Sequence, residues 1–261
     1  MTIVEELAMA YDGSFASVEE PLPGGFLNVV VRTGQVVRRP LPTAADYTHQ
    51  VLSLLEERDW PGAPRLLGID ERGREMLTYL EGFVPWESEN QPAVRSDAAL
   101  VAVARLVREL HDLTAGSALA AGGEVVCHND LSPKNTVYRQ VDARWLPVAF
   151  LDWDNAAAGQ RVYDLAHTCW QYIGLGPALP SAKRAAASVR LIADAYGLVD
   201  RSALISTILW WQDRCWRGIE ARADTGDPAM VRLRNLGVAA EVRSAYDWTA
   251  AHRTELDAAL R

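Results

Sequence analysis

The sequence predicts an α+β protein, with a small antiparallel sheet and one helix in its first part and a larger, mainly helical second part. Two observations carry this prediction. Short β-branched and apolar runs fill the first third of the 261 residues, whereas apolar residues recur at helical spacing through most of the remainder. Because strands come first and helices later, the order favours an α+β fold over a wound α/β sheet, in which the two would alternate.

The first part, taken as residues 1–80, reads as two strand pairs with a helix between them. The expected elements are strands at 28–32, 35–39, 65–69 and 75–80 and a helix over 44–58. Thr33-Gly34 and the polar run Asp70–Arg74 are typical of the tight turns that join such strands.

A linker over 81–95 and a helical part over 96–261 follow. Pro85 and Pro92 interrupt the linker, and Ser96 is a good N-cap for a helix over 97–113. Two short strands are expected at 136–139 and 148–151, and further helices near 162–175, 181–196, 201–222, 228–236 and 238–258.

Composition excludes several classes of protein. The formal net charge is −8, from 26 basic and 34 acidic residues, which is a poor match for nucleic acid. The three cysteines form no CxxC pair, so neither a disulfide framework nor a zinc site is indicated. With no targeting segment and no run long enough to span a membrane, we expect a cytoplasmic protein without a membrane partner. The sequence does not encode an oligomeric state that we can read.

The strongest chemical signal is His128-Asn129-Asp130-Leu131-Ser132-Pro133-Lys134-Asn135, which holds the pattern His-x-Asp-Leu-x-x-x-Asn. Phosphoryl transfer needs a carboxylate to orient an attacking hydroxyl and oxygen ligands for magnesium, and Asp130 and Asn135 on one short loop can serve both needs. The alternative is a polar loop with an Asx turn and a structural His128.

Two further signals follow the first. An apolar run from Val148 ends in Asp152-Trp153-Asp154, so a carboxylate stands at the end of a buried strand, where a metal ligand is well held. Read alone, the sequence would favour a turn or helix-capping role for Asp152; after the first motif, it favours a metal ligand. Asp164 lies near the start of a predicted helix, where it either caps that helix or reaches back to support the loop that carries Asp130.

Taken together, HNDLSPKN, FLDWD and YDLA resemble the aminoglycoside phosphotransferase and choline kinase superfamily, over about residues 20–170. The resemblance implies the bilobal fold of protein kinases, with Mg²⁺ and ATP or GTP as cofactors. It implies that Asp130 is the catalytic base, that Asn135 and Asp152 are magnesium ligands, and that His128 and Asp164 support the loop. The remaining implied nucleotide contacts are the phosphate loop with Gly24 and Gly25 and the hinge residues Thr78, Tyr79 and Leu80.

The sequence departs from this pattern on the third strand, which carries no lysine. Arg38 is our candidate for its role, with Arg39 as the alternative, because arginine can bind phosphate bidentately. The usual glutamate on the next helix falls near Thr48 or His49, and neither is acidic, so the positioning ion pair is not evident. This leaves open GTP as donor, and a nucleotide-binding pseudoenzyme or regulatory module as the alternative to an enzyme.

The resemblance places the acceptor site in the helical part. Asp154, Asp213 and Glu220 are the candidate acceptor-binding residues; the last two lie seven apart and therefore on one helix face. Carboxylates there would suit a cationic acceptor such as an aminoglycoside, although such pairs are also common on solvated helices. The expected function is thus a magnesium-dependent small-molecule kinase that phosphorylates a hydroxyl.

Overall fold

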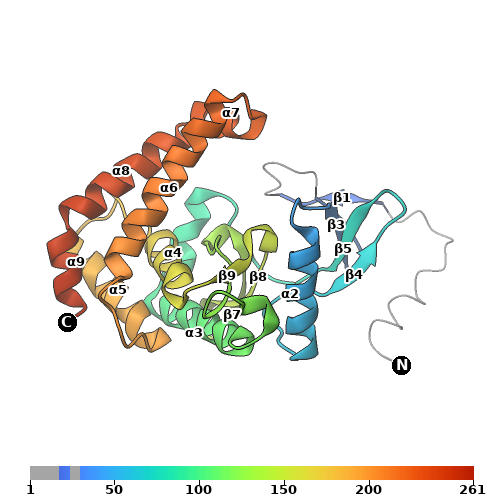
Figure 1. Ribbon diagram of the computed structural model, residues 1–261, viewed down its shortest axis with the longest axis horizontal. Helices are drawn as coiled ribbons and strands as arrows, with labels where there is room; N and C mark the ends of the chain where they lie inside the picture. Colours follow the sequence, from blue (N-terminus) through green and yellow to red (C-terminus); the bar gives the residue numbers. More distant parts are fainter. Residues whose placement is uncertain (1–17, 24–29) are drawn as a thin grey trace.

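The structure, a computed structural model, describes residues 18–23 and 30–261, so the expected phosphate loop with Gly24 and Gly25 lies outside the described residues. It has two parts (Figure 1). A sheet with helix α2 stands on one side, and a larger assembly of helices stands on the other. The α+β, kinase-like division predicted from the sequence is confirmed.

The smaller part is an antiparallel sheet of five strands in the order β1-β2-β3-β5-β4. Its strands are β1 (Glu20–Pro21), β2 (Val31–Thr33), β3 (Val36–Pro40), β4 (Leu66–Ile69) and β5 (Arg74–Thr78). Helix α2 (Ala45–Glu57) buries Val51, Leu52 and Leu55, which recur at helical spacing. In the β3–β5 ladder Arg39 pairs directly with Glu75, so the two side chains share one face of the sheet.

Two short hairpin-like sheets carry the loops predicted to be functional. The first pairs β6 (Val125–Cys127) with β9 (Ala157–Gly159), and the second pairs β7 (Thr136–Val141) with β8 (Arg144–Phe150). Asn135 precedes β7 and Asp152 follows β8, and the N–H of Leu151 donates to the carbonyl of Asn135 at 2.8 Å. Asp152, which follows Asp130 by 22 positions, therefore ends beside its loop, as the hairpin interpretation predicted.

Helices form the rest of the larger part. The α-helices are α3 (Asp97–Thr114), α4 (Arg161–Ile173), α5 (Ala182–Tyr196), α6 (Leu204–Asp224), α7 (Pro228–Asn235), α8 (Val238–Ala251) and α9 (Arg253–Ala259). The 3-10 turns are η1 (Ser88–Val94), η2 (Ala118–Ala120), η3 (Pro133–Asn135) and η4 (Trp153–Asn155). Ser96 caps α3 as expected, since its hydroxyl accepts from the N–H of Ala99. The helix expected over 238–258 is two helices, because the backbone leaves helical geometry at His252, whose ring bonds the carbonyl of Trp248.

One apolar core joins the two parts near the site. The ring of Trp60, which follows α2, lies 6.3 Å from that of Phe150 and 6.4 Å from that of Trp153. Phe150 ends β8 and Trp153 begins η4, so the two residues lie on either side of the Asp152 turn in the chain. Their contacts with Trp60 therefore fix the position of this turn relative to the smaller part. The aromatic packing thus positions a polar turn that carries candidate functional residues.

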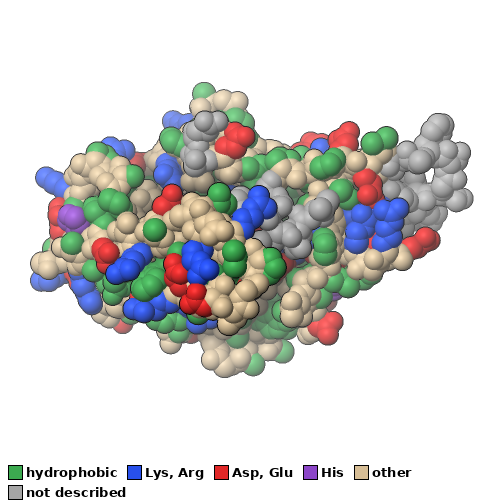
Figure 2. Space-filling view, turned by 90° about the horizontal axis from the view of Figure 1, so that it is seen from above, with side chains coloured by type: hydrophobic (Ala, Val, Ile, Leu, Met, Phe, Trp, Pro, Cys, Tyr) green, Lys and Arg blue, Asp and Glu red, His purple; other side chains and the backbone are tan. Residues whose placement is uncertain are grey.

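The surface carries charges of both signs. Figure 2 shows Lys and Arg side chains interspersed with Asp and Glu side chains on the face it presents, without a continuous basic stripe among the described residues. Within the part of the chain that the structure describes, no helix combines the length and apolar character that crossing a bilayer requires.

The linker between the two parts depends on Gly82, which generates a first prediction. Its φ is +155°, and an added Cβ would lie 2.4 Å from Val137 Cγ1 and 2.6 Å from the carbonyl oxygen of Tyr138. We expect Gly82→Ala to lower the free energy of unfolding by about 2 kcal/mol or more, from backbone strain and overpacking. Gly34→Ala is the matched control: φ is also positive, but the Cβ meets no atom within 4 Å, so the loss should be about 1 kcal/mol. Equal losses in urea denaturation would contradict the close approach.

Candidate functional site

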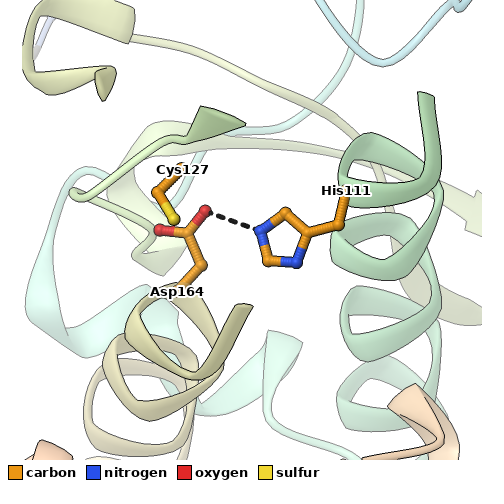
Figure 3. Close-up of side chains that lie close together, drawn as sticks. All are labelled: His111, Cys127 and Asp164. Atoms are coloured by element: carbon orange, nitrogen blue, oxygen red, sulfur yellow. Dashed lines mark hydrogen bonds and ion pairs between the residues drawn. The ribbon is translucent and has the colours of Figure 1, made fainter. Parts of the chain in front are cut away.

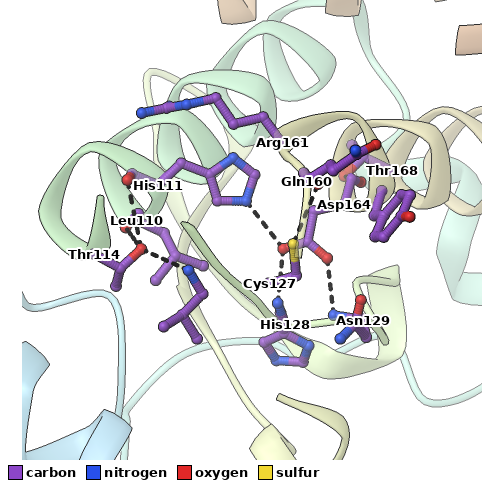
Figure 4. A network of polar contacts seen from close by, with 12 residues as sticks. Leu110, His111, Thr114, Cys127, His128, Asn129, Gln160, Arg161, Asp164 and Thr168 are labelled. Atoms are coloured by element: carbon purple, nitrogen blue, oxygen red, sulfur yellow. Dashed lines mark hydrogen bonds and ion pairs between the residues drawn. The ribbon is translucent and has the colours of Figure 1, made fainter. Parts of the chain in front are cut away.

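The loop that carries Asp130 is held in place by hydrogen bonds to one buried carboxylate, that of Asp164 on α4 (Figures 3 and 4). Asp164 is fully buried, and its two oxygens accept the backbone N–H groups of His128 at 2.7 Å and Asn129 at 2.8 Å. Gln160, and not Asp164, is the N-cap of α4. Of the two roles open to Asp164, the structure therefore has it supporting the loop.

His111, on the last turn of α3, completes this network. Its Nε2 lies 3.2 Å from Asp164 and its Nδ1 lies 2.7 Å from the hydroxyl of Tyr196. Sequence reasoning did not single out His111. The signal available was a polar side chain on the face of α3 that otherwise buries apolar residues, because His111 follows Leu110 and is fully buried.

The side chains of His111, Cys127 and Asp164 lie close enough to suggest a metal site, but their hydrogen bonds explain them (Figure 3). Both oxygens of Asp164 are already taken by donors, and the Cys127 thiol points to the carbonyl of Gln160 at 3.3 Å. Burial, with a smaller effect of Asp164, raises the pKa of Cys127 well above its usual value, so the thiol stays protonated. The cluster is a loop anchor.

His128 supports the loop from within, as a neutral ring. Burial lowers the pKa of His128 below its usual value. Its Nε2–H donates to the carbonyl of Leu151 at 2.9 Å, and its Nδ1 accepts the N–H of Asp130 at 3.3 Å. A single neutral tautomer satisfies both contacts and ties the Asp130 loop to the strand that leads to Asp152.

Asp130 and Asn135 are brought together. The Nδ2 of Asn135 donates to the carboxylate of Asp130 at 3.0 Å and to its carbonyl at 2.9 Å. Burial, and to a lesser extent the charge of Asp152, raises the pKa of Asp130, whereas Lys134 opposes the rise. Asn135 uses its amide N–H groups on Asp130, and its amide oxygen accepts no hydrogen bond from the described residues, so that oxygen is available as a ligand.

Two residues of the site adopt left-handed backbone. Asn129 and Asp152 both have φ of +62°, a conformation that Asn and Asp tolerate better than most residues. At Asp152 it turns the chain sharply from β8 into η4, so the carboxylate projects at the end of the strand and is 46% exposed. The left-handed conformation of these turn residues thus determines where the polar side chains of the site project.

Arg39 faces this turn from the opposite part of the molecule. Its Nη1 lies 3.0 Å from Asp152 and its Nη2 lies 2.5 Å from Asp154. Burial disfavours the charge of Arg39, but the carboxylates of Asp154, Glu75 and Asp152 raise its pKa above the usual value, so it remains a cation. Asp154, a candidate acceptor-binding residue from the sequence, belongs to this ion-pair group.

The sequence favoured Arg38 for the phosphates, with Arg39 as the alternative, whereas the arginine that the structure places beside Asp152 is Arg39. Side chains alternate along β3, so Arg39 faces Asp152 while Arg38 faces Asp70, with Nε 3.7 Å from its carboxylate. Because one position changes the face, a choice between adjacent arginines could not be made from the run Val36–Pro40 alone.

Glu75 on β5 provides the ion pair that the sequence had left missing. It is fully buried, and it hydrogen-bonds Arg39 Nε and lies 2.8 Å from His49 Nε2 on α2. His49, at the position expected for a helix glutamate, therefore contacts the arginine through a strand glutamate. Sequence reasoning missed Glu75 because the pair forms across strands 36 residues apart.

The donor set fits a magnesium ion. Asn135 and Asp152 offer hard oxygen atoms on adjacent turns, the ligand type that Mg²⁺ prefers. Around them, the carboxylates of Glu75, Asp152 and Asp154 face the single guanidinium of Arg39, which leaves the group with surplus negative charge. Such a surplus attracts a divalent cation.

The expected hinge lies where β5 ends. The N–H of Thr78 donates to the carbonyl of Arg65, and that of Tyr79 donates to the carbonyl of Gln35 at 2.8 Å. Leu80 makes no backbone hydrogen bond to the rest of the described chain, so its N–H and C=O are available to a ligand.

Asp213 and Glu220 on α6 are not brought to this site. Asp213 pairs with Arg217 at 2.8 Å and Glu220 with Arg234 at 3.6 Å. The side of α6 nearer the Asp130 loop instead carries Trp211, whose Nε1–H donates to the carbonyl of Tyr163 at 2.9 Å.

The anchoring role of Asp164 generates a second prediction. We expect Asp164→Asn to cost about 3 kcal/mol of unfolding free energy at pH 7, because an amide cannot accept both loop N–H groups and leaves His111 without its partner. Burial would raise the pKa of Asp164, but the bonds from His111 and the loop lower it overall. Its stabilisation is therefore complete above the unfolded value of about 3.9 and is lost as pH falls through the folded pKa.

Urea denaturation at pH 7 and near pH 3 measures this. The difference between wild type and Asp164→Asn should shrink at the lower pH, because below about 3.9 the unfolded carboxylate takes up a proton and the advantage of the ionised anchor declines. Asp200→Asn, at an exposed turn, is the control and should change stability little. An Asp164→Asn difference that is the same at both pH values would contradict the charged anchor.

A sequence model of the phosphotransferase enzyme family matches residues 114–198, which include the Asp130 loop, Asn135, Asp152 and Asp164. The chain is 31% identical to the trifolitoxin immunity protein of Rhizobium leguminosarum bv. trifolii over 281 aligned positions, covering 92% of this chain and 97% of that protein.

Solved structures share the fold. Wild-type aminoglycoside 2'-phosphotransferase-IIIa in its GDP complex aligns with a TM-score of 0.60 at 13% identity, over 95% of this chain and 97% of that one. An aminoglycoside phosphotransferase of Streptomyces rimosus, in complex with ADP and streptomycin, aligns at 0.57 and 18% identity over 80% and 97%. A choline/ethanolamine kinase family protein of Mesorhizobium loti aligns at 0.52 and 14% over 95% and 99%. The chain therefore belongs to the superfamily of aminoglycoside phosphotransferases and choline kinases.

Proposed function

We propose that the protein is a magnesium-dependent kinase that transfers the γ-phosphoryl group of ATP or GTP to a hydroxyl of a small molecule. One observation carries the proposal: Asp130, Asn135 and Asp152 lie on adjacent turns, with the cation of Arg39 facing them. Neighbours of the same fold were solved with GDP and with ADP, so both donors stay within the proposal. Nucleoside triphosphate as the donor also fits a cytoplasmic setting.

Each residue has a role in this proposal. Asn135 and Asp152 would hold Mg²⁺, which supplies charge neutralisation at the phosphates. Arg39 would move part of its hydrogen bonding from Asp152 and Asp154 to the phosphate oxygens, while Glu75 keeps its Nε in place. Leu80 offers the backbone groups for the nucleobase.

Asp130 would act on the acceptor. Its carboxylate accepts the proton of the attacking hydroxyl as the new O–P bond forms and the bond to the leaving nucleoside diphosphate breaks. Asn135 holds that carboxylate in place, and the loop N–H groups bound by Asp164 keep the loop rigid. The raised pKa of Asp130 makes it a better base than an exposed aspartate, as long as it is ionised.

The alternative of a nucleotide-binding pseudoenzyme rested on the missing ion pair. The Arg39–Glu75 contact makes this alternative less favoured, because a buried glutamate does hold the arginine. The relative named for immunity to trifolitoxin favours one setting for the kinase chemistry, namely the modification of a toxic compound.

Two neighbouring arginines allow a controlled test of donor binding. We expect Arg39→Ala to weaken magnesium-dependent binding of ATP and GTP by roughly tenfold or more, because a charge-assisted, partly buried phosphate contact is lost. Arg38→Ala is the matched control on the other face of β3 and should leave nucleotide affinity within about twofold. Isothermal titration calorimetry measures both. Equal affinities for the two variants would contradict the assignment of Arg39.

The role of Asp130 is tested by rate rather than affinity. We expect Asp130→Ala to lower phosphoryl transfer by about 10² to 10⁴, the usual contribution of a positioned base. Nucleotide binding should persist in the same variant, which shows that it is folded. Release of nucleoside diphosphate in the presence of acceptor is the measurement, and unchanged turnover in Asp130→Ala would refute the role.

A further inference from the structure

We propose that the acceptor is a hydroxyl compound that also carries an oxyanion, such as a carboxylate or phosphate, held by Lys134 and Arg214, and that it is not a polyamine. This inference rests on the proposed kinase function and concerns its substrate class.

One edge of α6 lies against the loop that carries Asp130. Helix α6 runs beside α4 (Figure 1), and Trp211 donates to the carbonyl of Tyr163 at the start of α4. The Trp211 ring also lies edge-on to His167, with centroids 5.0 Å apart, and His167 Nδ1 donates to the carbonyl of Leu131 at 2.9 Å. Only one side chain therefore separates Trp211 from the residue after Asp130.

Cys215 follows Trp211 by one helical turn and lies on the same edge. Burial raises the pKa of its thiol to about 11, with a smaller contribution from Asp130 in the same direction and an opposing one from Lys134. Asp130 and Lys134 belong to the loop that His167 and Trp211 connect to this edge of α6. One turn further, Gly218 borders open space, since an added Cβ would meet no atom within 4 Å. This edge is the side of α6 that an acceptor near Asp130 would contact.

The residues of α6, all of them described, place no carboxylate on this edge. Because residues advance by about 100° along a helix, Asp213 and Glu220 point away from the edge defined by Trp211 and Cys215. Their charges are also compensated, by Arg217 on α6 and Arg234 on α7. A polycationic acceptor would therefore find its two expected partners turned away and already paired.

Two exposed cations of the described chain lie on the two elements that meet here, Lys134 on the Asp130 loop and Arg214 on α6. Lys134 lies on η3 between Asp130 and Asn135, is exposed, and makes no hydrogen bond or ion pair within the described chain. Arg214, next to Cys215, is exposed and likewise pairs with no carboxylate among the described residues; its guanidinium lies 5.5 Å from the Trp210 ring. An exposed cation that forms no ion pair within the described chain, on either of the two elements that meet at the acceptor side of Asp130, suits an anionic group of the acceptor.

An aromatic surface adjoins these cations. Trp210 is 45% exposed and stacks on Tyr163, with centroids 5.6 Å apart and an interplanar angle of 23°. Such an exposed pair offers a flat apolar face to a planar or hydrophobic portion of a ligand. Cations and aromatics together describe an acceptor with an oxyanion, a hydroxyl and an apolar part.

Matched probes test the charge preference. Mandelate, mandelamide and 2-amino-1-phenylethanol share a phenyl ring and a secondary hydroxyl but carry negative, zero and positive charge. With Mg²⁺ and ATP or GTP, release of nucleoside diphosphate should be stimulated most by mandelate, by roughly tenfold over the amine, because the carboxylate forms a charge-assisted hydrogen bond whereas the ammonium is repelled. A phosphorylated hydroxyl compound, glycerol 3-phosphate, distinguishes a phosphate from a carboxylate preference. Preference for the amine or for kanamycin, or no dependence on charge, would overturn the inference.

Substitutions at Lys134 and Arg214 test whether these two residues cause the preference for an anionic acceptor. Lys134→Glu and Arg214→Glu should each raise KM for mandelate by roughly tenfold and narrow its advantage over the amine, while Lys134→Arg should keep the wild-type preference. Lys183→Glu, on the exposed first turn of α5, is the charge-matched control and should behave as wild type. If Lys134→Glu instead weakens nucleotide binding as much as it raises KM, Lys134 serves the donor and the inference fails. If wild type binds no nucleotide, the kinase proposal itself fails.

Discussion

The ion pairs of Arg39 are the constraint on which the site depends, because they join strand β3 to the turn that carries Asp152 and Asp154. A guanidinium that is 12% exposed must be compensated, and three carboxylates surround it. Glu75 is fully buried between Arg39 and His49 and cannot reach a cation from solvent, whereas Asp152 is 46% exposed and can exchange the arginine for another cation. Because of this difference in burial, the contact of Arg39 with Glu75 is structural, whereas its contacts with the more exposed Asp152 and Asp154 can be exchanged.

A second carboxylate organises the opposite side of the site. Asp164 has no access to solvent and uses both oxygens to hold the backbone of His128 and Asn129. Asp130, next along the loop, is left with one side-chain partner, Asn135, and a raised pKa. The same chemical group is thus an anchor where donors surround it and, in the function that we propose, a base where they do not. Neutral His128 links the two by bonding the loop and the strand before Asp152.

Local patterns in the sequence predicted much of this arrangement. Asn135 and Asp152 come together beside Asp130 because one hairpin, β7–β8, joins the two turns, and short apolar runs in both of its strands are visible in the sequence. Contacts that depend on register were not predictable in the same way. Arg38 and Arg39 differ only in which side of β3 they face, and Glu75 meets Arg39 only because β3 and β5 pair in one register. The spacing of Asp213 and Glu220 indicated a shared helix face, but not which way that face points.

The central claim is that Asp152 and Asn135 form a magnesium–nucleotide site closed by Arg39. Magnesium-dependent thermal stabilisation by ATP and by GTP, measured side by side on wild type and on Asp152→Asn, tests it most directly, because a ligand that binds only the folded state raises the unfolding midpoint. We expect the midpoint to rise with at least one nucleotide in wild type, and we expect this rise to depend on Mg²⁺ and to be lost in Asp152→Asn. No rise with either nucleotide at millimolar concentration, or an equal rise in the variant, would contradict it.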